Sequence, residues 1–562
     1  MANTTLPILR ELESLRGDYG PDIAPRRLEL LRRLESRRLR SARQIVRLHE
    51  ILAFLRAYPD DVAVLGQVES MLASFATRAD LLAFRDLLAD SGIVGTDIYY
   101  RFYWVIARWL ARRWPELLTI DWSEFDNRDR LLDTLDLLLP YSETLGVDSA
   151  TLSAQEWLER LKGPGETDAA FLIRRFAALD AGEAMRERIY EQLDVPLRLA
   201  GEATTPSRTH AFYGRSKVAF QSQPLSRQRP SLRIEMNRPP VYVRALSARQ
   251  GQRIIDLARG AMATRGRDLD AFADANPRDV RLIGFERGLE FACLGARPER
   301  RLMLKGRYGF LTLKNGVPIG YAQTTGLFGS AEIAYNIFDT FRGAEAALVF
   351  ARLLAAARHL FGCDVFAIDP YQLGYGNSEG LASGAWWFYY KLGFRPVDRE
   401  VRAIVRNELA TMKAKPGHRS SLGTLEKLSA AYVYFYADRP RKDVLGRIPL
   451  EEIGLRLSDY LAERFGSNRE AGLRTCSREA AERLGLDGRF RLGRGERLAW
   501  NRWSPLVCLL PGVGDWKPAE KRALIGVIRA KGGPRESEYL RRFDAHARLR
   551  SACLELASGS RR

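Results

Sequence analysis

The chain has 562 residues, and its 88 lysine and arginine residues against 69 aspartate and glutamate residues give a formal net charge of +19. Hydrophobic residues make up 46% and charged residues 28% of the sequence, a globular balance that excludes a wholly disordered chain. At roughly 150 residues each, about three or four domains are expected. The N-terminus lacks the apolar segment of a signal peptide and no run of 18 apolar residues occurs, so we expect a cytoplasmic protein without membrane insertion.

The positive charge is unevenly distributed along the chain. Residues 1–200 contain 27 basic and 32 acidic residues, a net charge of −5, whereas residues 201–562 contain 61 and 37, a net charge of +24. This asymmetry favours an anionic partner for the second part of the chain. Residues 301–400 contain ten basic and eight acidic residues, so the positive charge flanks this segment.

Cysteine and histidine are too scattered to predict a disulfide framework or a metal site. The five cysteines include no C-x-x-C pair, and no two of the five histidines lie at helical i, i+4 spacing. An odd number of cysteines in a long chain is typical of a protein from a reducing compartment.

The hydrophobic pattern and the composition divide the chain into four parts. Residues 1–200 show apolar residues at three-to-four spacing and predict a helical domain. Residues 201–237 are basic and rich in proline, which is typical of an extended linker. Residues 238–438 alternate strand and helix patterns, and residues 439–562 are again mainly helical. The fold class is therefore predicted as a central α/β domain with a mixed sheet, flanked by mainly α-helical N- and C-terminal domains.

The first half of the α/β domain predicts a strand, a helix and a hairpin. Residues 241–246 alternate as in a strand, and Ser247 with Gln250 has the capping-box spacing of a helix start. Residues 308–313 and 317–323 flank an Asn-Gly pair, which tolerates the positive φ angles of a tight hairpin turn.

The second half predicts a strand–loop–helix unit. Residues 332–338 form a third strand, and residues 339–347 form a loop that leads into a helix ending at Gly362. A strand over residues 364–368 and a helix over residues 385–394 follow. Free amide groups at a helix N-terminus, together with small side chains, suit a pyrophosphate, so this loop is a candidate anion site.

Two segments resemble the GNAT superfamily, the CoA-dependent N-acetyltransferases. The family's Arg/Gln-x-x-Gly-x-Gly/Ala pyrophosphate loop corresponds to the run Arg342-Gly343-Ala344-Glu345-Ala346-Ala347. Residues 385–394, with the sequence AWWFYYKLGF, resemble the family's Ala-x-x-Leu-Tyr-x-x-x-Gly-Phe segment. The resemblance covers residues 238–438 and implies a GNAT-like fold that uses acetyl-CoA or another acyl-CoA, without a metal.

The resemblance also implies roles for individual residues. Residues 342–347 would hold the CoA pyrophosphate, and Tyr389 falls on the tyrosine that protonates the leaving thiolate in many members. Two positions depart from the family: Glu345 replaces the central loop glycine and Ala382 replaces an asparagine, for which Asn377 is a candidate substitute. Glu345 is expected either to point into the cleft and oppose the diphosphate, or to point outward as a first-turn acid.

The implied reaction is direct transfer of an acyl group from acyl-CoA to an amine acceptor. A backbone N–H of the strand before the loop would polarise the thioester carbonyl, Glu332 on that strand is the candidate general base, and Tyr389 is the candidate acid. Each residue has a simpler interpretation: Glu332 as an exposed strand carboxylate, and Tyr389 as a packing tyrosine. The acceptor is a small molecule or a protein.

Two other functions are compatible with the sequence. Glu345 and Ala382 favour a binding or scaffold protein on a catalytically degenerate GNAT-like fold. The net charge of +24 over residues 201–562 favours association with tRNA or another nucleic acid, as in the aminoacyl-tRNA-dependent transferases that share this fold, although recognised nucleic-acid motifs are absent.

Overall fold

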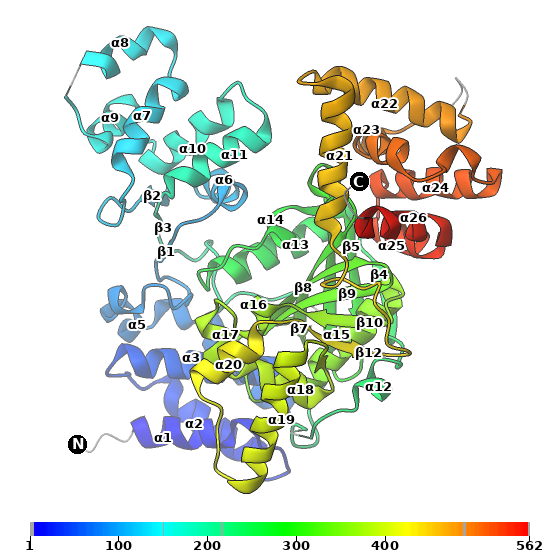
Figure 1. Ribbon diagram of the computed structural model, residues 1–562. Coiled ribbons are helices and arrows are strands. Elements are labelled where there is room, and N and C mark those ends of the chain that lie inside the picture. The colour runs from blue at the N-terminus through cyan, green and yellow to red at the C-terminus, as the bar shows by residue number, and fades with distance from the viewer. Residues whose placement is uncertain (1–4, 150, 215–216, 227, 487–490, 560–562) are drawn as a thin grey trace.

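The computed structural model describes residues 5–149, 151–214, 217–226, 228–486 and 491–559. It is a mixed α/β protein with a large central sheet and helical segments at both ends of the chain, as predicted (Figure 1). The N-terminal helices and the C-terminal helices lie on different sides of the sheet region (Figure 1). None of the helices in the described ranges is long and apolar enough to cross a membrane.

The N-terminal 200 residues contain two separate hydrophobic cores. The first lies among residues 8–94 and the second mainly among residues 98–199. The helices of the first core are α1 (Thr5–Ser14), α2 (Ile23–Glu35), α3 (Ala42–Ala57), α4 (Val62–Ala73) and α5 (Ala79–Ala83). Those of the second are α6 (Trp104–Arg113), α7 (Arg128–Leu138), α8 (Tyr141–Ser149), α9 (Ala154–Leu161), α10 (Asp168–Ala178) and α11 (Glu183–Leu193).

A small sheet in the second core differs from the all-helical expectation. It has the order β1-β3-β2, and its antiparallel strands are β1 (Ile98–Tyr100), β2 (Leu118–Ile120) and β3 (Leu197–Leu199). Strands of three residues are too short to show an alternating pattern, which explains why helical periodicity dominated the prediction.

The described residues of the basic, proline-rich segment 201–237 run between the N-terminal helices and the central sheet and form no strand. Its one described helix is the short α12 (Leu232–Glu235). Arg208 donates hydrogen bonds to Glu50 and, at 2.7 Å, to Thr340 at the end of the sheet. Thr209 Oγ1 lies 2.9 Å from His49 Nε2 in the first helical core. The segment is therefore a packed strap that joins the two parts.

The central sheet has nine strands in the order β11-β12-β10-β9-β8-β7-β6-β5-β4. Neighbouring strands are antiparallel except β9 and β10, which are parallel. The strands are β4 (Tyr242–Ala245), β5 (Ala275–Gly284), β6 (Leu289–Ala296), β7 (Gly306–Lys314), β8 (Val317–Leu327), β9 (Ser330–Ile337), β10 (Val365–Ile368), β11 (Arg395–Pro396) and β12 (Val433–Tyr436).

Helices cover both faces of the sheet. On one face, Phe310 contacts Phe361 of α15 (Ala346–Phe361), and α25 (Glu536–Ala545) packs near Gly306. On the opposite face, Phe272 of α14 (Asp270–Ala273) packs over Gly309. The other helices of this part are α13 (Ala248–Ala263), α16 (Pro370–Leu373), α17 (Ser378–Ser383), α18 (Ala385–Leu392), α19 (Arg399–Ala414) and α20 (Leu422–Ser429).

Most predicted elements of residues 238–438 are present. Ser247 and Gln250 form the expected capping box at the start of α13, and Gly362 ends α15 with a φ of 76°. Strands β5 and β6 were not predicted, since nearly every residue of both is buried and no alternation marks them.

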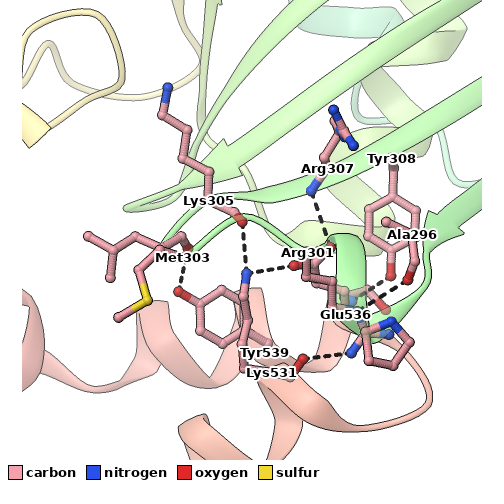
Figure 2. A network of polar contacts seen from close by, with 12 residues as sticks. Ala296, Arg301, Met303, Lys305, Arg307, Tyr308, Lys531, Glu536 and Tyr539 are labelled. Atoms are coloured by element: carbon pink, nitrogen blue, oxygen red, sulfur yellow. Dashed lines mark hydrogen bonds and ion pairs between the residues drawn. The ribbon is translucent and has the colours of Figure 1, made fainter. Parts of the chain in front are cut away.

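The C-terminal helices share the hydrophobic core of the central sheet. At their contact with the β6–β7 connection, Lys531 donates hydrogen bonds to Glu536 at 2.6 Å and to the carbonyl of Lys305 at 2.8 Å (Figure 2). Arg301 donates to the carbonyls of Lys531 and Ala296 (Figure 2). The helices are α21 (Leu450–Phe465), α22 (Arg469–Leu484), α23 (Arg494–Leu509), α24 (Pro518–Gly532), α25 and α26 (Ala547–Ser558).

Candidate functional site

The parallel strands β9 and β10 separate along their length. Their register runs from Ser330–Val365 to Glu332–Ala367, whereas β9 continues to pair with β8 as far as Ile337. Helix α15 connects the two strands, and the chain leaves β10 for the α16–α17 segment directly after Ile368. Residues 333–337 therefore present one backbone edge that no strand of the described sheet covers.

The loop before α15 leaves an open approach to a helix N-terminus. Gly343 has a φ of +84°, and a Cβ added there would meet no atom within 4 Å. The first amides of α15, at Ala346 and Ala347, have no carbonyl partner within the helix. Tyr335 of β9 donates a hydrogen bond of 2.9 Å to the carbonyl of Ala346 and fixes the helix start against the sheet. The arrangement suits an anion held by backbone amides.

The Glu345 side chain is buried under this loop. It therefore takes neither of the two orientations expected for it, into the cleft or outward to solvent. The residue is 4% exposed, and its carboxylate accepts a hydrogen bond of 3.2 Å from Lys314 at the end of β7. Arg287 lies 3.7 Å from the same carboxylate, and the Lys314 ammonium lies 4.8 Å from the ring centre of Tyr58, the residue after α3. Burial lowers the pKa of Lys314 against the opposing effect of Glu345. The charges of Lys314 and Glu345 at this helix start therefore neutralise each other.

Arg342 and Asn377 make contacts within the protein. Arg342 pairs with Asp339 at 2.7 Å and with Glu379 of α17 at 2.9 Å. Asn377 caps α17 by accepting from the amide of Gly380 at 3.1 Å, and its Nδ2 donates to a backbone carbonyl. Asn377 therefore shapes the α16–α17 segment, while Arg342 connects that segment to the loop before α15.

Tyr389 lies in an aromatic cluster between α18 and α15. Its ring centre is 5.5 Å from that of Phe350 and 5.7 Å from that of Phe394, and the residue is 3% exposed. Burial, with a smaller contribution from the charge of Asp369, raises the pKa of the Tyr389 hydroxyl. A tyrosine with a raised pKa is protonated at neutral pH and so retains a proton to donate.

Glu332 lies at the point where β9 and β10 separate. Its carboxylate accepts a hydrogen bond of 3.2 Å from the hydroxyl of Tyr432, and the side chain is partly buried. Burial is the main cause of its raised pKa; Asp369 raises it further, while Lys305 and Tyr432 lower it. A carboxylate with a raised pKa in a partly buried position is a suitable general base.

The structure divides the predicted site residues into two groups. Tyr389 packs on Phe350 of α15 and so lies near the loop before this helix, whereas Glu332 accepts a hydrogen bond from Tyr432 beside the start of β12. The loop residues 342–347 follow the other end of β9, which lies about 17 Å along the strand from Glu332 by the usual rise per residue. Strand β9 therefore runs from one group of residues to the other.

A pocket of about 410 Å³, which sequence reasoning missed, opens beside the end of β9. It is lined by Asn336 and Arg342, by Thr264 to Arg267 after α13, by Arg208 of the strap, and by Asp90, Ile98 and Tyr99 of the N-terminal part. Its four arginines come from three separate segments, so no local motif could have identified it. The basic character of the strap was the only relevant sequence signal.

Comparisons of the chain with protein-family models, with curated proteins and with solved structures give no match.

Proposed function

We propose that the protein is an N-acyltransferase that moves an acyl group, by preference acetyl, from acyl-CoA to an amine acceptor. The observation that carries the proposal is the separation of β9 from β10 beside a helix N-terminus, with Glu332 at the last pair of the two strands and Tyr389 packed on α15. Sequence segments similar to the GNAT superfamily occur at the same two places, the start of α15 and helix α18.

The proposed chemistry is a single displacement. The acceptor nitrogen attacks the thioester carbonyl carbon, a C–N bond forms and the C–S bond breaks. Glu332 accepts the proton that the amine loses, and the Tyr389 hydroxyl supplies a proton to the departing thiolate. A backbone N–H on the uncovered edge of residues 333–337 donates to the carbonyl oxygen as negative charge develops on it.

The residues at the start of α15 fit the pyrophosphate of the acyl-CoA. Gly343 leaves room for close approach, and the helix amides supply donors. The charge of Glu345, which would oppose a diphosphate, is offset by Lys314 at 3.2 Å and by Arg287. Asn377 is excluded from this role in the proposal because both ends of its amide are used within α16–α17.

Calorimetric titration of the full chain with acetyl-CoA and with longer acyl-CoAs tests the proposal. Saturable binding by at least one of them is expected; no binding by any at high micromolar concentration would contradict it. Acyl transfer to a panel of amines is then measured for the wild-type protein and for Tyr389→Phe. Loss of transfer with retained acyl-CoA binding is expected, because the variant lacks the proton donor.

Tyr390→Phe is the matched control, since it removes a hydroxyl from the next position of the same helix. Tyr390 stacks on Trp386, with ring centres 5.1 Å apart, so its aromatic packing survives the change. Equal losses in both variants would assign the effect to the packing of α18.

A second candidate is a binding protein without catalysis, favoured by the position of Tyr389 at 3% exposure within an aromatic cluster. In that case acyl-CoA binds but no amine is acylated, and Tyr389→Phe leaves binding unchanged.

A further inference from the structure

The pocket beside the end of β9 brings together four guanidinium groups, and three of them already have carboxylate partners. Arg208 pairs with Glu50, Arg267 with Glu379 at 2.9 Å, and Arg342 with Asp339 and Glu379. Two carboxylates, Asp90 and Asp339, also line the pocket. Arg265 is the exception among these arginines, because none of the described carboxylates pairs with it.

Arg265 is held rigidly in spite of this missing partner. Its guanidinium carbon stacks 3.6 Å from the ring centre of Phe338, and its Nη1 donates to the carbonyl of Ala261 at 2.8 Å and contacts Thr264 Oγ1 at 3.4 Å. Nε and Nη2 make no hydrogen bond to any residue in the described ranges, so two donors remain for a ligand.

The surroundings make an unpaired cation at this position costly. Burial is the main cause of the lowered pKa of Arg265. Arg208 and Arg267 lower it further, while the more distant carboxylates of Glu50 and Asp339 oppose the shift. The Arg265 side chain is half-buried, and taking a charge even partly out of water costs free energy that an opposite charge can recover. An anion in the pocket would supply the missing pair and would relieve the repulsion among these arginines.

The pocket opens onto the face of β9 that carries Glu332. Glu332 and Asn336 are four residues apart on one strand, so their side chains share a face, and Asn336 lines the pocket. Along the strand the two positions are about 13 Å apart. This is the face opposite α15, whereas the loop residues 343–347 do not line the pocket.

We propose that this arginine pocket binds a phosphate group of the acceptor and thereby holds its amine toward Glu332. The assignment to an acceptor rests on the proposed acyltransferase function. A phosphate offers three acceptor oxygens, enough for Arg265 and a second guanidinium, and a volume of about 410 Å³ is within the range of small-molecule sites. The acceptor class is therefore a phosphorylated amine.

Titration of the full chain with inorganic phosphate tests the pocket itself. Saturable binding is expected, weakened at least about tenfold in Arg265→Gln, since a charge-assisted hydrogen bond of this kind is worth about 1.5–3 kcal/mol. Asn336→Asp adds a negative charge to the pocket from a different element and is expected to weaken binding without removing the arginine. Arg112→Gln, an exposed arginine of α6, is the matched control.

Acetyl-CoA titration of the same variants separates the two proposals. Unchanged acetyl-CoA affinity in Arg265→Gln supports a pocket for the acceptor, whereas a parallel loss would make the pocket part of the acyl-CoA site and overturn the assignment. Absence of phosphate binding, or wild-type affinity in both Arg265→Gln and Asn336→Asp, would contradict the pocket alone. Failure of acetyl-CoA to bind the wild-type protein would contradict the proposed function and, with it, the acceptor.

Discussion

Lys314 and Glu345 form an ion pair of 3.2 Å in which both side chains are almost fully buried. The pair connects the end of β7 to the start of α15, and the ring of Tyr58, the residue after α3, packs against Lys314 from the side of the N-terminal helices. A negative charge at a helix start is favourable in itself, and the lysine offsets that charge locally. The pair therefore stabilises the loop that the proposed function assigns to a pyrophosphate.

Removing one member of this pair is expected to destabilise the protein strongly. Lys314→Met leaves the Glu345 carboxylate buried without its lysine, and such a change typically costs about 3–5 kcal/mol. The denaturant midpoint of unfolding measures the effect. The double variant Lys314→Met/Glu345→Leu replaces the pair by apolar side chains and should recover most of the loss; a double variant as unstable as the single one would contradict the account.

The second buried lysine pair holds the C-terminal helices onto the sheet. Lys531 and Glu536 are 4% and 0% exposed at their side chains and lie 2.6 Å apart. Lys531→Met leaves Glu536 unpaired and also removes the hydrogen bond to the Lys305 carbonyl. Amide hydrogen exchange should therefore accelerate more in α24 and α25 than in α3, which lies in the N-terminal core. Lys517→Met, at an exposed lysine before α24, is the control and should leave exchange unchanged.

Asp268 makes stability depend on pH in a direction unusual for an aspartate. Burial raises its pKa to about 7, while the Tyr103 amide donates to it at 3.0 Å. The folded state thus binds a proton that the unfolded state releases near pH 4, so this group's contribution to stability falls as pH rises from about 4 to 7, by up to about 1.4 kcal/mol per pH unit.

Thermal unfolding of wild-type protein and Asp268→Asn at pH 5 and pH 8 tests this sign. The asparagine cannot ionise and keeps an oxygen for the Tyr103 amide, so the variant should lose less stability than the wild type between the two pH values. Asp133→Asn, at an exposed aspartate of α7, should follow the wild type. Parallel curves for Asp268→Asn and the wild type would contradict the raised pKa.

Local signals in the sequence predicted much of the central fold. The Asn-Gly pair adopts positive φ angles of 48° and 84° at Asn315 and Gly316, as a tight hairpin requires, and Gly362 ends α15 in a left-handed conformation. Strands β5 and β6 lacked such a signal, because burial on both faces removes alternation and the turn between them uses Arg287 and Gly288.

The site was less accessible to sequence reasoning than the fold. The partner of Glu345 is 31 residues earlier in the chain, and no helical or strand spacing relates it to Lys314. Arg208 and Arg265 meet only because the strap packs across the end of the sheet. Long-range ion pairing depends on the complete tertiary structure, whereas caps and turns depend on neighbouring residues.

The pH dependence of acyl transfer should report the environment of Glu332. A general base acts when deprotonated, so under the proposed function the rate should rise with pH through the raised pKa of Glu332 and then level off. Tyr432→Phe removes the hydrogen bond that favours the charged carboxylate, and the rising limb should therefore move to higher pH. Glu332→Gln should lower the rate by about 10²–10⁴-fold and abolish the limb, with Glu400→Gln at an exposed position of α19 as control. A limb that persists in Glu332→Gln would assign the titration to another group.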